Sequence, residues 1–247
     1  MKEFNGVDIR KTRKDQVSQS LYEKNYQYRL LNLSKGKIYQ ASKINTGSIA
    51  LMSSPYKNSK IKINDKEIKL SKFRFFIFNL KKIKIESNSR ITLGIAGLKK
   101  KIVNDKIKNF REKDIYKVNK PWGYELWING KSSEYSFKKI FLKKGHRTSL
   151  QFHKKKIETN FLYKGSAELT LSKKNGKYKK EEIIKNIYKK RLAPGCYINV
   201  NNYAVHRLKA ISDIILFEVS TPHLDDVIRL ADDKKRKDGK ISKEHKN

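Results

Sequence analysis

Two stretches in the second half of the chain carry the side chains that could do chemistry. Gln151 and His153 are separated by one residue, Glu158 follows a lysine-rich turn, and His206 lies further along. On a β-strand, residues two apart point to the same face, so Gln151 and His153 can both face a barrel interior. An amide oxygen, two imidazoles and a carboxylate form a mixed set suited to Zn²⁺, Mn²⁺, Fe²⁺ or Ni²⁺. We therefore predict one divalent metal site, with Zn²⁺ as the first expectation.

All histidines of the chain lie beyond residue 145, namely His146, His153, His206, His223 and His245. Taken singly, a histidine in a β-rich chain is more often a hydrogen-bonded structural residue than a ligand. A lone glutamate after a lysine run is usually part of a surface ion pair. The spacing of the whole set is what favours a site, and it assigns any metal or acid–base centre to the second half.

Most segments have the pattern of β-strands, with short runs rich in Ile, Phe, Tyr and Val between polar residues. Turn signals such as Asn129-Gly130, Asn175-Gly176 and Pro194-Gly195 separate the runs. Many short strands at this spacing favour a sandwich or barrel over alternating βαβ units. The predicted strands cover residues 60–68, 73–80, 82–86, 90–96, 135–142, 161–163, 166–171, 197–200 and 213–220.

Composition shifts along the chain predict its division into parts. Residues 1–30 are too polar for a definite assignment and are expected to form an N-terminal arm. Residues 31–103 are expected to form one β domain, and residues 116–231 a second. Residues 104–115 are charged with little apolar periodicity, which indicates a linker or short helix. The charge run of residues 232–247 predicts a disordered tail.

The order of the candidate ligands resembles the two motifs of the cupin superfamily, G-x5-H-x-H-x3,4-E-x6-G and G-x5-P-x-G-x2-H. Gln151 stands at the first histidine of the first motif. The other matching positions are Gly145, His153, Glu158 and Gly165 in the first motif, and Gly195 and His206 in the second.

A closer resemblance is to the C-terminal isomerase domain of the type II phosphomannose isomerase family, over about residues 116–233. That family carries a PWG-Y opening, an S-L-Q-x-H stretch followed by Glu, a V-H-R triplet and an E-D-D-I-V-R-like segment. The matching segments here are Pro121-Trp122-Gly123-Tyr124, Ser149-Leu150-Gln151-Phe152-His153, Val205-His206-Arg207 and Leu224-Asp225-Asp226-Val227-Ile228-Arg229.

The resemblance implies a cupin-type double-stranded β-helix, or jelly-roll, barrel for residues 116–231. It implies Gln151, His153, Glu158 and His206 as metal ligands. Residues 35–98 have a similar strand texture without histidine, so we expect a bicupin with a degenerate N-terminal barrel. A short β extension covering an edge of the second barrel is the alternative.

The sequence also departs from the family pattern. Lys154-Lys155 stands in place of two further histidines, and Thr159-Asn160 in place of a His-Trp pair. Asn201 and Tyr203 replace the proline and glycine of the second motif. A catalytically silent descendant is therefore an open alternative.

For an isomerase, a proton would move between C1 and C2 of an aldose or ketose phosphate, which needs a general base. Glu218 is the candidate, because strand alternation places it opposite Phe217 and potentially inside the barrel. Arg147, Lys155 and Arg229 are the candidates for binding phosphate.

The predicted function is accordingly a metal-dependent cupin acting on a sugar phosphate or nucleotide-linked sugar, as an aldose–ketose isomerase of the mannose-6-phosphate isomerase type. Two alternatives stay open: a non-catalytic cupin that binds a sugar ligand in surface-polysaccharide metabolism, and an Fe²⁺-dependent cupin dioxygenase. Gln151 in place of a histidine makes the dioxygenase less favoured. The cupin resemblance also leads us to expect a homodimer.

The formal net charge of +35 raises the question of nucleic acid or an anionic membrane as a partner. The excess is mostly lysine, runs along the whole chain and accompanies abundant Ile and Asn, which favours a solvated surface over a binding face. We expect no nucleic-acid or membrane partner and an anionic small-molecule sugar substrate. Cys196 is the single cysteine, which excludes an internal disulfide and, with the absence of a long apolar segment, predicts a cytoplasmic protein.

Overall fold

The computed structural model describes residues 6–11, 18–19, 26–41, 44–52, 58–70, 74–102, 104–130, 132 and 134–245. Within these residues the regular structure is almost entirely antiparallel β-sheet, with one short α-helix, α1 (Lys180–Lys185). The predicted all-β class is confirmed. None of the described helices is long and apolar enough to cross a membrane.

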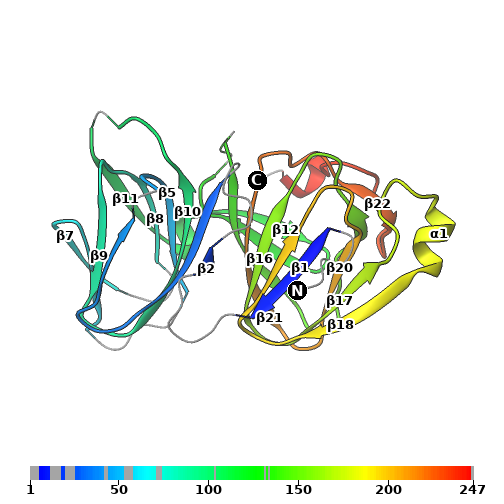
Figure 1. The fold of residues 1–247 in the computed structure, drawn as a ribbon, viewed down its shortest axis with the longest axis horizontal. Coiled ribbons are helices and arrows are strands. Elements are labelled where there is room, and N and C mark those ends of the chain that lie inside the picture. The colour runs from blue at the N-terminus through cyan, green and yellow to red at the C-terminus, as the bar shows by residue number, and fades with distance from the viewer. Residues whose placement is uncertain are drawn as a thin grey trace. The chain divides into compact units, whose positions relative to one another are not determined.

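The chain forms two units. The N-terminal unit comprises Thr12–Tyr116 and Ile128–Lys131, and the C-terminal unit comprises Met1–Lys11, Lys117–Trp127 and Ser132–Asn247. Each unit contains two antiparallel sheets, with its core between them (Figure 1).

The N-terminal unit has a six-stranded sheet in the order β11-β8-β5-β10-β3-β2 and a four-stranded sheet in the order β4-β9-β6-β7. Its strands are β2 (Ser18–Gln19), β3 (Gln27–Leu33), β4 (Ile38–Ala41), β5 (Thr46–Leu51), β6 (Lys60–Ile63), β7 (Lys66–Lys69), β8 (Arg74–Asn79), β9 (Ile83–Ser87), β10 (Ile91–Leu98) and β11 (Lys106–Arg111). In β6 the alternation expected from the sequence is observed, because Ile61 and Ile63 are buried and Lys60 and Lys62 are exposed.

The segment predicted to be a linker differs from that expectation. Residues 106–111 form β11, which pairs antiparallel with β8 from Lys106↔Asn79 to Arg111↔Arg74. β11 is an edge strand with mostly exposed charged side chains, and edge strands commonly carry lysine. Because its side chains are mostly charged and exposed, the sequence pattern did not indicate a strand there.

The C-terminal unit has a seven-stranded sheet in the order β1-β19-β16-β21-β14-β13-β12 and a five-stranded sheet in the order β18-β17-β20-β15-β22. Its strands are β1 (Val7–Lys11), β12 (Tyr116–Lys120), β13 (Gly123–Trp127), β14 (Ser136–Leu142), β15 (Leu150–Phe152), β16 (Glu158–Lys164), β17 (Ala167–Ser172), β18 (Ile187–Leu192), β19 (Cys196–Val200), β20 (His206–Ala210), β21 (Ile214–Ser220) and β22 (Ile228–Ala231).

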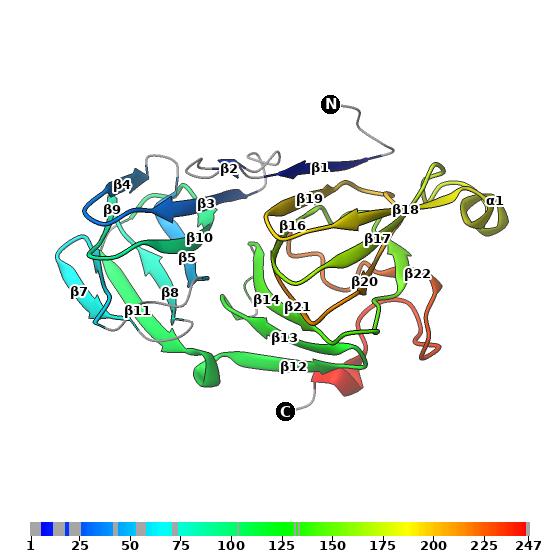
Figure 2. The same ribbon diagram turned by 90° about the horizontal axis from the view of Figure 1, so that it is seen from below.

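Both ends of the chain differ from the predicted boundaries. β1 lies within the expected N-terminal arm, yet it pairs with β19 of the C-terminal unit from Val7↔Val200 to Lys11↔Cys196 (Figure 2). The expected disordered tail instead makes specific contacts: the Gly239 amide donates to the Val227 carbonyl at 2.8 Å, and Asp238 Oδ1 accepts from the Arg229 amide at 2.7 Å. Figure 2 shows this segment, drawn in red, beside β12. Polar contacts with residues outside the segment, rather than apolar periodicity, order it.

Candidate metal centre

Strand pairing brings the four predicted ligands together in the C-terminal unit. Gln151 on β15 lies directly opposite His206 on β20, so their side chains are cross-strand neighbours. His153 follows β15 immediately, and Glu158 is the first residue of β16 in the other sheet. One sheet therefore presents the Gln151 amide and the His206 imidazole, the residue after β15 presents the His153 imidazole, and the other sheet presents the carboxylate.

The distances between these side chains fit one shared ion. Glu158 Oε1 lies 3.4 Å from His206 Nε2, and Glu158 Oε2 lies 3.9 Å from His153 Nε2. One ligand atom of each of these three residues lies within 4.8 Å of the others. Ligands bound to a common ion at about 2.0–2.2 Å stand roughly 3–4 Å apart. The three residues could thus hold a divalent metal.

Gln151 completes the ring but presents its amide nitrogen. Nε2 lies 3.4 Å from His153 Nε2 and 3.5 Å from His206 Nε2, while Oε1 accepts a hydrogen bond from Ser149 Oγ at 2.6 Å. Ligation by the amide oxygen needs a rotation of the amide by about 180°, which exchanges two groups of nearly equal shape.

The outer nitrogens of both imidazoles are held by backbone carbonyls. His206 Nδ1 lies 3.0 Å from the carbonyl of Ala204, and His153 Nδ1 makes a short contact with the carbonyl of Asp226. A carbonyl can only accept, so the proton resides on Nδ1 and each Nε2 lone pair faces the centre, as in metal-bound histidines. Burial and the nearby Lys156 charge lower the pKa of His153 to about 3, which keeps its ring neutral.

Lys156 adds a buried positive charge to this centre. Its Nζ donates to Glu158 Oε2 at 2.5 Å and to Glu218 Oε1 at 3.0 Å, and the residue is 6% exposed. Burial alone would lower the pKa of Lys156, but the two carboxylates raise it above its ordinary value. Burial likewise opposes ionisation of Glu158, yet Lys156 and the two histidines hold the pKa of that carboxyl well below its usual range. A metal at this centre would share Glu158 with Lys156.

Lys156 and Glu218 belong to a row of buried charged residues that continues across the neighbouring strands to Lys138 and Glu125. Lys138 lies opposite Glu218 in the β14–β21 pairing, and its Nζ is 3.6 Å from Glu218 Oε1 and 3.4 Å from Glu125 Oε2. Trp127 Nε1 donates to Glu125 Oε2 at 2.9 Å. Burial would raise the pKa of Glu125, but Lys138, Lys120 and the Trp127 bond together lower it to about 2. Glu125 and Glu218 therefore each have a buried lysine partner.

These residues line one cavity of about 150 Å³. Glu218 lines it, which agrees with the interior position expected from strand alternation. Arg229 lines it too, but its Nη1 donates to the carbonyls of Lys237 and Gly239. The lining also contains all four predicted ligands, together with Glu125, Lys138 and Lys156.

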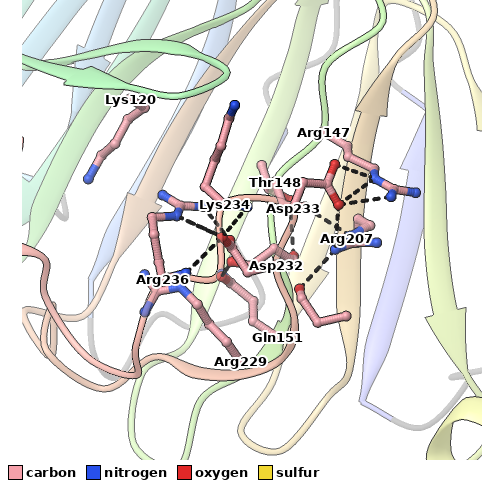
Figure 3. A network of polar contacts seen from close by, with 12 residues as sticks. Lys120, Arg147, Thr148, Gln151, Arg207, Arg229, Asp232, Asp233, Lys234 and Arg236 are labelled. Carbon is pink, nitrogen blue, oxygen red and sulfur yellow. Dashed lines mark hydrogen bonds and ion pairs between the residues drawn. The ribbon is translucent and has the colours of Figure 1, made fainter.

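Two predicted phosphate-binding residues are not in the cavity lining. The exposed Arg147 guanidinium instead binds the carboxylate of Asp233, with Nε–Oδ2 and Nη2–Oδ1 distances of 2.8 Å (Figure 3). Lys155 is exposed, and its backbone amide donates to Asp226. Asp233 already neutralises Arg147, and the Lys155 side chain is exposed. The structure therefore does not bring either residue to the site.

Lys156, Lys138 and Glu125 were not identified from the sequence, although a signal for them exists. Lys156 lies two residues before Glu158 and Glu125 two before Trp127, so strand periodicity places each with a neighbour on one face. In a chain with 59 Lys and Arg residues, a single lysine carries little information.

Tyr203 supports His153 from a backbone conformation that is unusual for its type. It stands where the second cupin motif has glycine, and its φ is 60°, a region that side chains with a Cβ rarely adopt. Its amide donates to the His153 carbonyl at 2.6 Å, and its ring stacks on Phe152 with centroids 6.1 Å apart. These contacts offset the strain.

No family model and no curated protein matches the sequence. Solved structures match in fold. Protein Ylba from E. coli, of family model DUF861, has a TM-score of 0.62 at 9% identity over 90% of this chain and 93% of its own. Lactobacillus farciminis oxalate decarboxylase, in a formate complex, has a TM-score of 0.59 at 12% identity over 92% and 87%.

Bacillus subtilis oxalate decarboxylase, which is described as having Mn(II) centres, has a TM-score of 0.56 at 10% identity over 83% of this chain and 71% of its own. These structures share the cupin β-barrel fold. Identities this low bear on the fold alone, and alignments of this length span both units. The expected bicupin architecture is confirmed in this sense.

Proposed function

Proceeding from the cupin fold, we propose that the C-terminal unit is a metal-dependent isomerase that interconverts an aldose phosphate and a ketose phosphate, of the mannose-6-phosphate isomerase type. The observation that carries the proposal is the convergence of Gln151, His153, Glu158 and His206 on one point of a cavity that also holds Glu218. The motif resemblance over residues 116–233 supports the sugar-phosphate class.

A divalent ion held by these four side chains would polarise the substrate carbonyl and ease loss of a proton from the adjacent carbon. The two imidazoles present Nε2, and Glu158 presents Oε1 toward His206 while Asn160 Nδ2 donates to that oxygen at 3.0 Å. The donor set is suited to Zn²⁺ or Mn²⁺ with positions left for substrate oxygens.

Glu218 would act as the general base. Its carboxylate would take the proton from C2 of the aldose and return it to C1, while the hydroxyl proton passes from O2 to O1, so atoms and charge balance. Lys156 at 3.0 Å and Lys138 at 3.6 Å from Glu218 Oε1 hold the carboxylate in place at the cavity lining. The same ammonium groups would stabilise negative charge that develops on the substrate oxygens.

The first test is metal content by elemental analysis of the purified protein beside three variants. We expect near-stoichiometric Zn, Mn, Fe or Ni in the wild type, and loss of this metal in His206→Ala and Gln151→Ala. His146→Ala removes an exposed histidine outside the cavity lining and should keep the metal. A wild type without metal after incubation with each ion would contradict the proposal.

The second test is an isomerase screen with hexose 6-phosphates on the metal-loaded protein. Glu218→Gln should abolish turnover while metal content stays unchanged, because the amide cannot accept a proton. Turnover that persists in this variant would remove Glu218 from the role of base without affecting the metal site.

A second candidate function is a metal-free cupin that binds a sugar ligand without turning it over. The Lys156 ammonium favours it, because at 2.5 Å from Glu158 it already supplies a cation to the carboxylate. Under this alternative the wild type contains no metal. Lys156→Met would then either free Glu158 to bind a metal or abolish binding of the sugar ligand.

A further inference from the structure

Two cations at the cavity lining converge on one carboxylate of the C-terminal segment. Lys120 Nζ lies 2.8 Å from Glu244 Oε2, and Arg236 Nη1 lies 3.2 Å from Glu244 Oε1. Lys120 and Arg236 both line the cavity that contains the four candidate ligands. Glu244 belongs to the 3₁₀ segment Ser242–His245. A carboxylate held between two cavity cations is the arrangement that an anionic ligand group would adopt.

We propose that Lys120 and Arg236 form the subsite for a phosphate monoester, and that Glu244 is an internal anion that occupies this subsite until the ligand displaces it. The inference rests on the proposed function, and it identifies the phosphate contacts of that site. It replaces Arg147 and Lys155, which the structure places elsewhere.

The two cations are partly withdrawn from water. The Lys120 and Glu244 side chains are each 12% exposed, and that of Arg236 is 11% exposed, so their attraction is less screened than on an open surface. Arg236 is also held by Asp232 at 2.7 Å, a contact drawn in Figure 3. This second contact fixes the guanidinium before a ligand arrives.

Two further lysines, Lys138 and Lys240, line the cavity that contains the subsite. His245 lies at its edge, with its ring 5.3 Å from that of Trp127. Burial lowers the pKa of His245 to about 4, and the charges of Lys120 and Lys240 act in the same direction. A phosphate dianion carries more charge than the carboxylate that it would displace, so it would gain more from the same two cations.

The size of the cavity supports displacement of the C-terminal segment. A cavity of about 150 Å³ accommodates a molecule of the size of benzene, whereas a hexose phosphate is larger. Gly239, Lys240, Ile241 and His245 line the cavity from outside both sheets. Moving them enlarges the site without breaking strand pairing, and moving the 3₁₀ segment Ser242–His245 takes Glu244 away from Lys120 and Arg236.

The test is isothermal titration of the full-length protein with mannose 6-phosphate, mannose and inorganic phosphate, with and without added metal. Two variants separate the partners: Glu244→Gln removes the internal anion, and Lys120→Gln removes one cation. Glu181→Gln and Lys180→Gln are matched controls, because they make the same charge changes on exposed positions of α1. Circular dichroism checks that each variant is folded.

We expect mannose 6-phosphate to bind about fivefold more tightly to Glu244→Gln and about tenfold more weakly to Lys120→Gln, with the controls within about twofold of the wild type. Inorganic phosphate should follow the same order, and mannose should respond to neither variant. Phosphate affinity that is equal or weaker in Glu244→Gln, or a failure of both phosphates to bind wild type and Glu244→Gln, would overturn the inference.

The result separates the subsite from the proposed function. If the variants change phosphate affinity as expected but the protein holds no metal, the subsite stands and the isomerase does not. If metal and turnover are present but Glu244→Gln leaves phosphate affinity unchanged, the isomerase stands and the subsite fails.

Discussion

Between the sheets of the N-terminal unit lies a cluster of Leu, Ile and Phe side chains, whereas the C-terminal unit encloses lysines, glutamates and histidines beside its apolar cluster. Arg29 is the buried charged side chain in the described part of the N-terminal unit. In the C-terminal unit, Glu125, Lys138, Lys156 and Glu218 are all buried around one cavity.

The buried charges of the C-terminal unit make its interior less favourable for stability than the apolar interior of the N-terminal unit. Burial of a charge is unfavourable unless it is paired, and apolar side chains of similar volume often stabilise a core more than ion pairs do. Two units of related architecture therefore serve different purposes. The apolar interior of the N-terminal unit stabilises a fold, and the charged interior of the C-terminal unit has the properties of a site.

The largest effect should come from removing the central cation. Lys156→Met leaves Glu158 and Glu218 buried with fewer partners, so the free energy of unfolding of the metal-free protein should fall by about 3–5 kcal/mol. Urea denaturation measures it, with the exposed Lys154→Met as the matched control. A divalent ion should restore part of the loss, because it supplies charge to Glu158. A loss no larger than that of the control would show that the ion pair contributes no net stability.

A substitution in the apolar interior of the N-terminal unit should test whether that interior contributes stability alone. Leu93→Ala truncates a fully buried side chain of the N-terminal unit, so stability should fall by about 2–4 kcal/mol while metal content is unchanged. Leu216 borders the existing cavity, so Leu216→Ala should lower the free energy of unfolding by less. Denaturation and elemental analysis of the same samples measure both. If Leu93→Ala lowered metal content in the folded protein, the two interiors would not be independent.

Ionisation of Glu125 should make the free energy of unfolding depend on pH. Its pKa falls from 4.5 in the unfolded chain to about 2 in the folded protein, so its stabilisation is present above about pH 4.5 and is lost as pH falls toward 2. Glu125→Gln should therefore lower stability by about 2–3 kcal/mol at pH 7. The difference from wild type should shrink steadily between pH 4.5 and 2. A difference that stays constant with pH would assign the effect to packing rather than to charge.

The residues that could be predicted from the sequence are those whose spacing is tied to strand geometry. Gln151 and His153 share a face because they are two apart, and the motif order places Glu158 and His206 at the same point. Long-range pairing is not encoded in spacing. Glu244 meets Lys120 across 124 residues of sequence, and no local pattern indicates that contact.

Composition misled the prediction at β11 and at the C-terminal segment, and motif membership misled it at Arg147. β11 and the C-terminal segment are rich in charge, and they are ordered by partners that lie elsewhere in the chain, in β8 and in Val227 and Lys120 respectively. Arg147 lies inside a family motif, but Asp233 holds its guanidinium away from the cavity. In each case a tertiary partner decides the structure, and a single sequence does not identify that partner.

The smallest effect concerns the backbone beside the site. Tyr203, at φ 60°, carries strain of about 1–2 kcal/mol, whereas the N-terminal unit places Asn64 at φ 51° in a turn, where asparagine is well tolerated. Tyr203→Gly relieves the strain but loses the contact with Phe152, so its net effect should lie within about 1 kcal/mol of zero. Tyr203→Ala loses the ring and keeps the strain, so it should be about 1 kcal/mol less stable than the glycine variant.

That order is the reverse of the one expected at an ordinary position, where glycine is less stable than alanine. Tyr178, which is exposed and not among the described residues with positive φ, provides the control, and there Tyr178→Gly should be the less stable of the pair. Thermal unfolding of the four variants measures both differences. If alanine were the more stable replacement at Tyr203 as well, the Tyr203 backbone would not be strained. Only the buried charges would then lower the stability of the site.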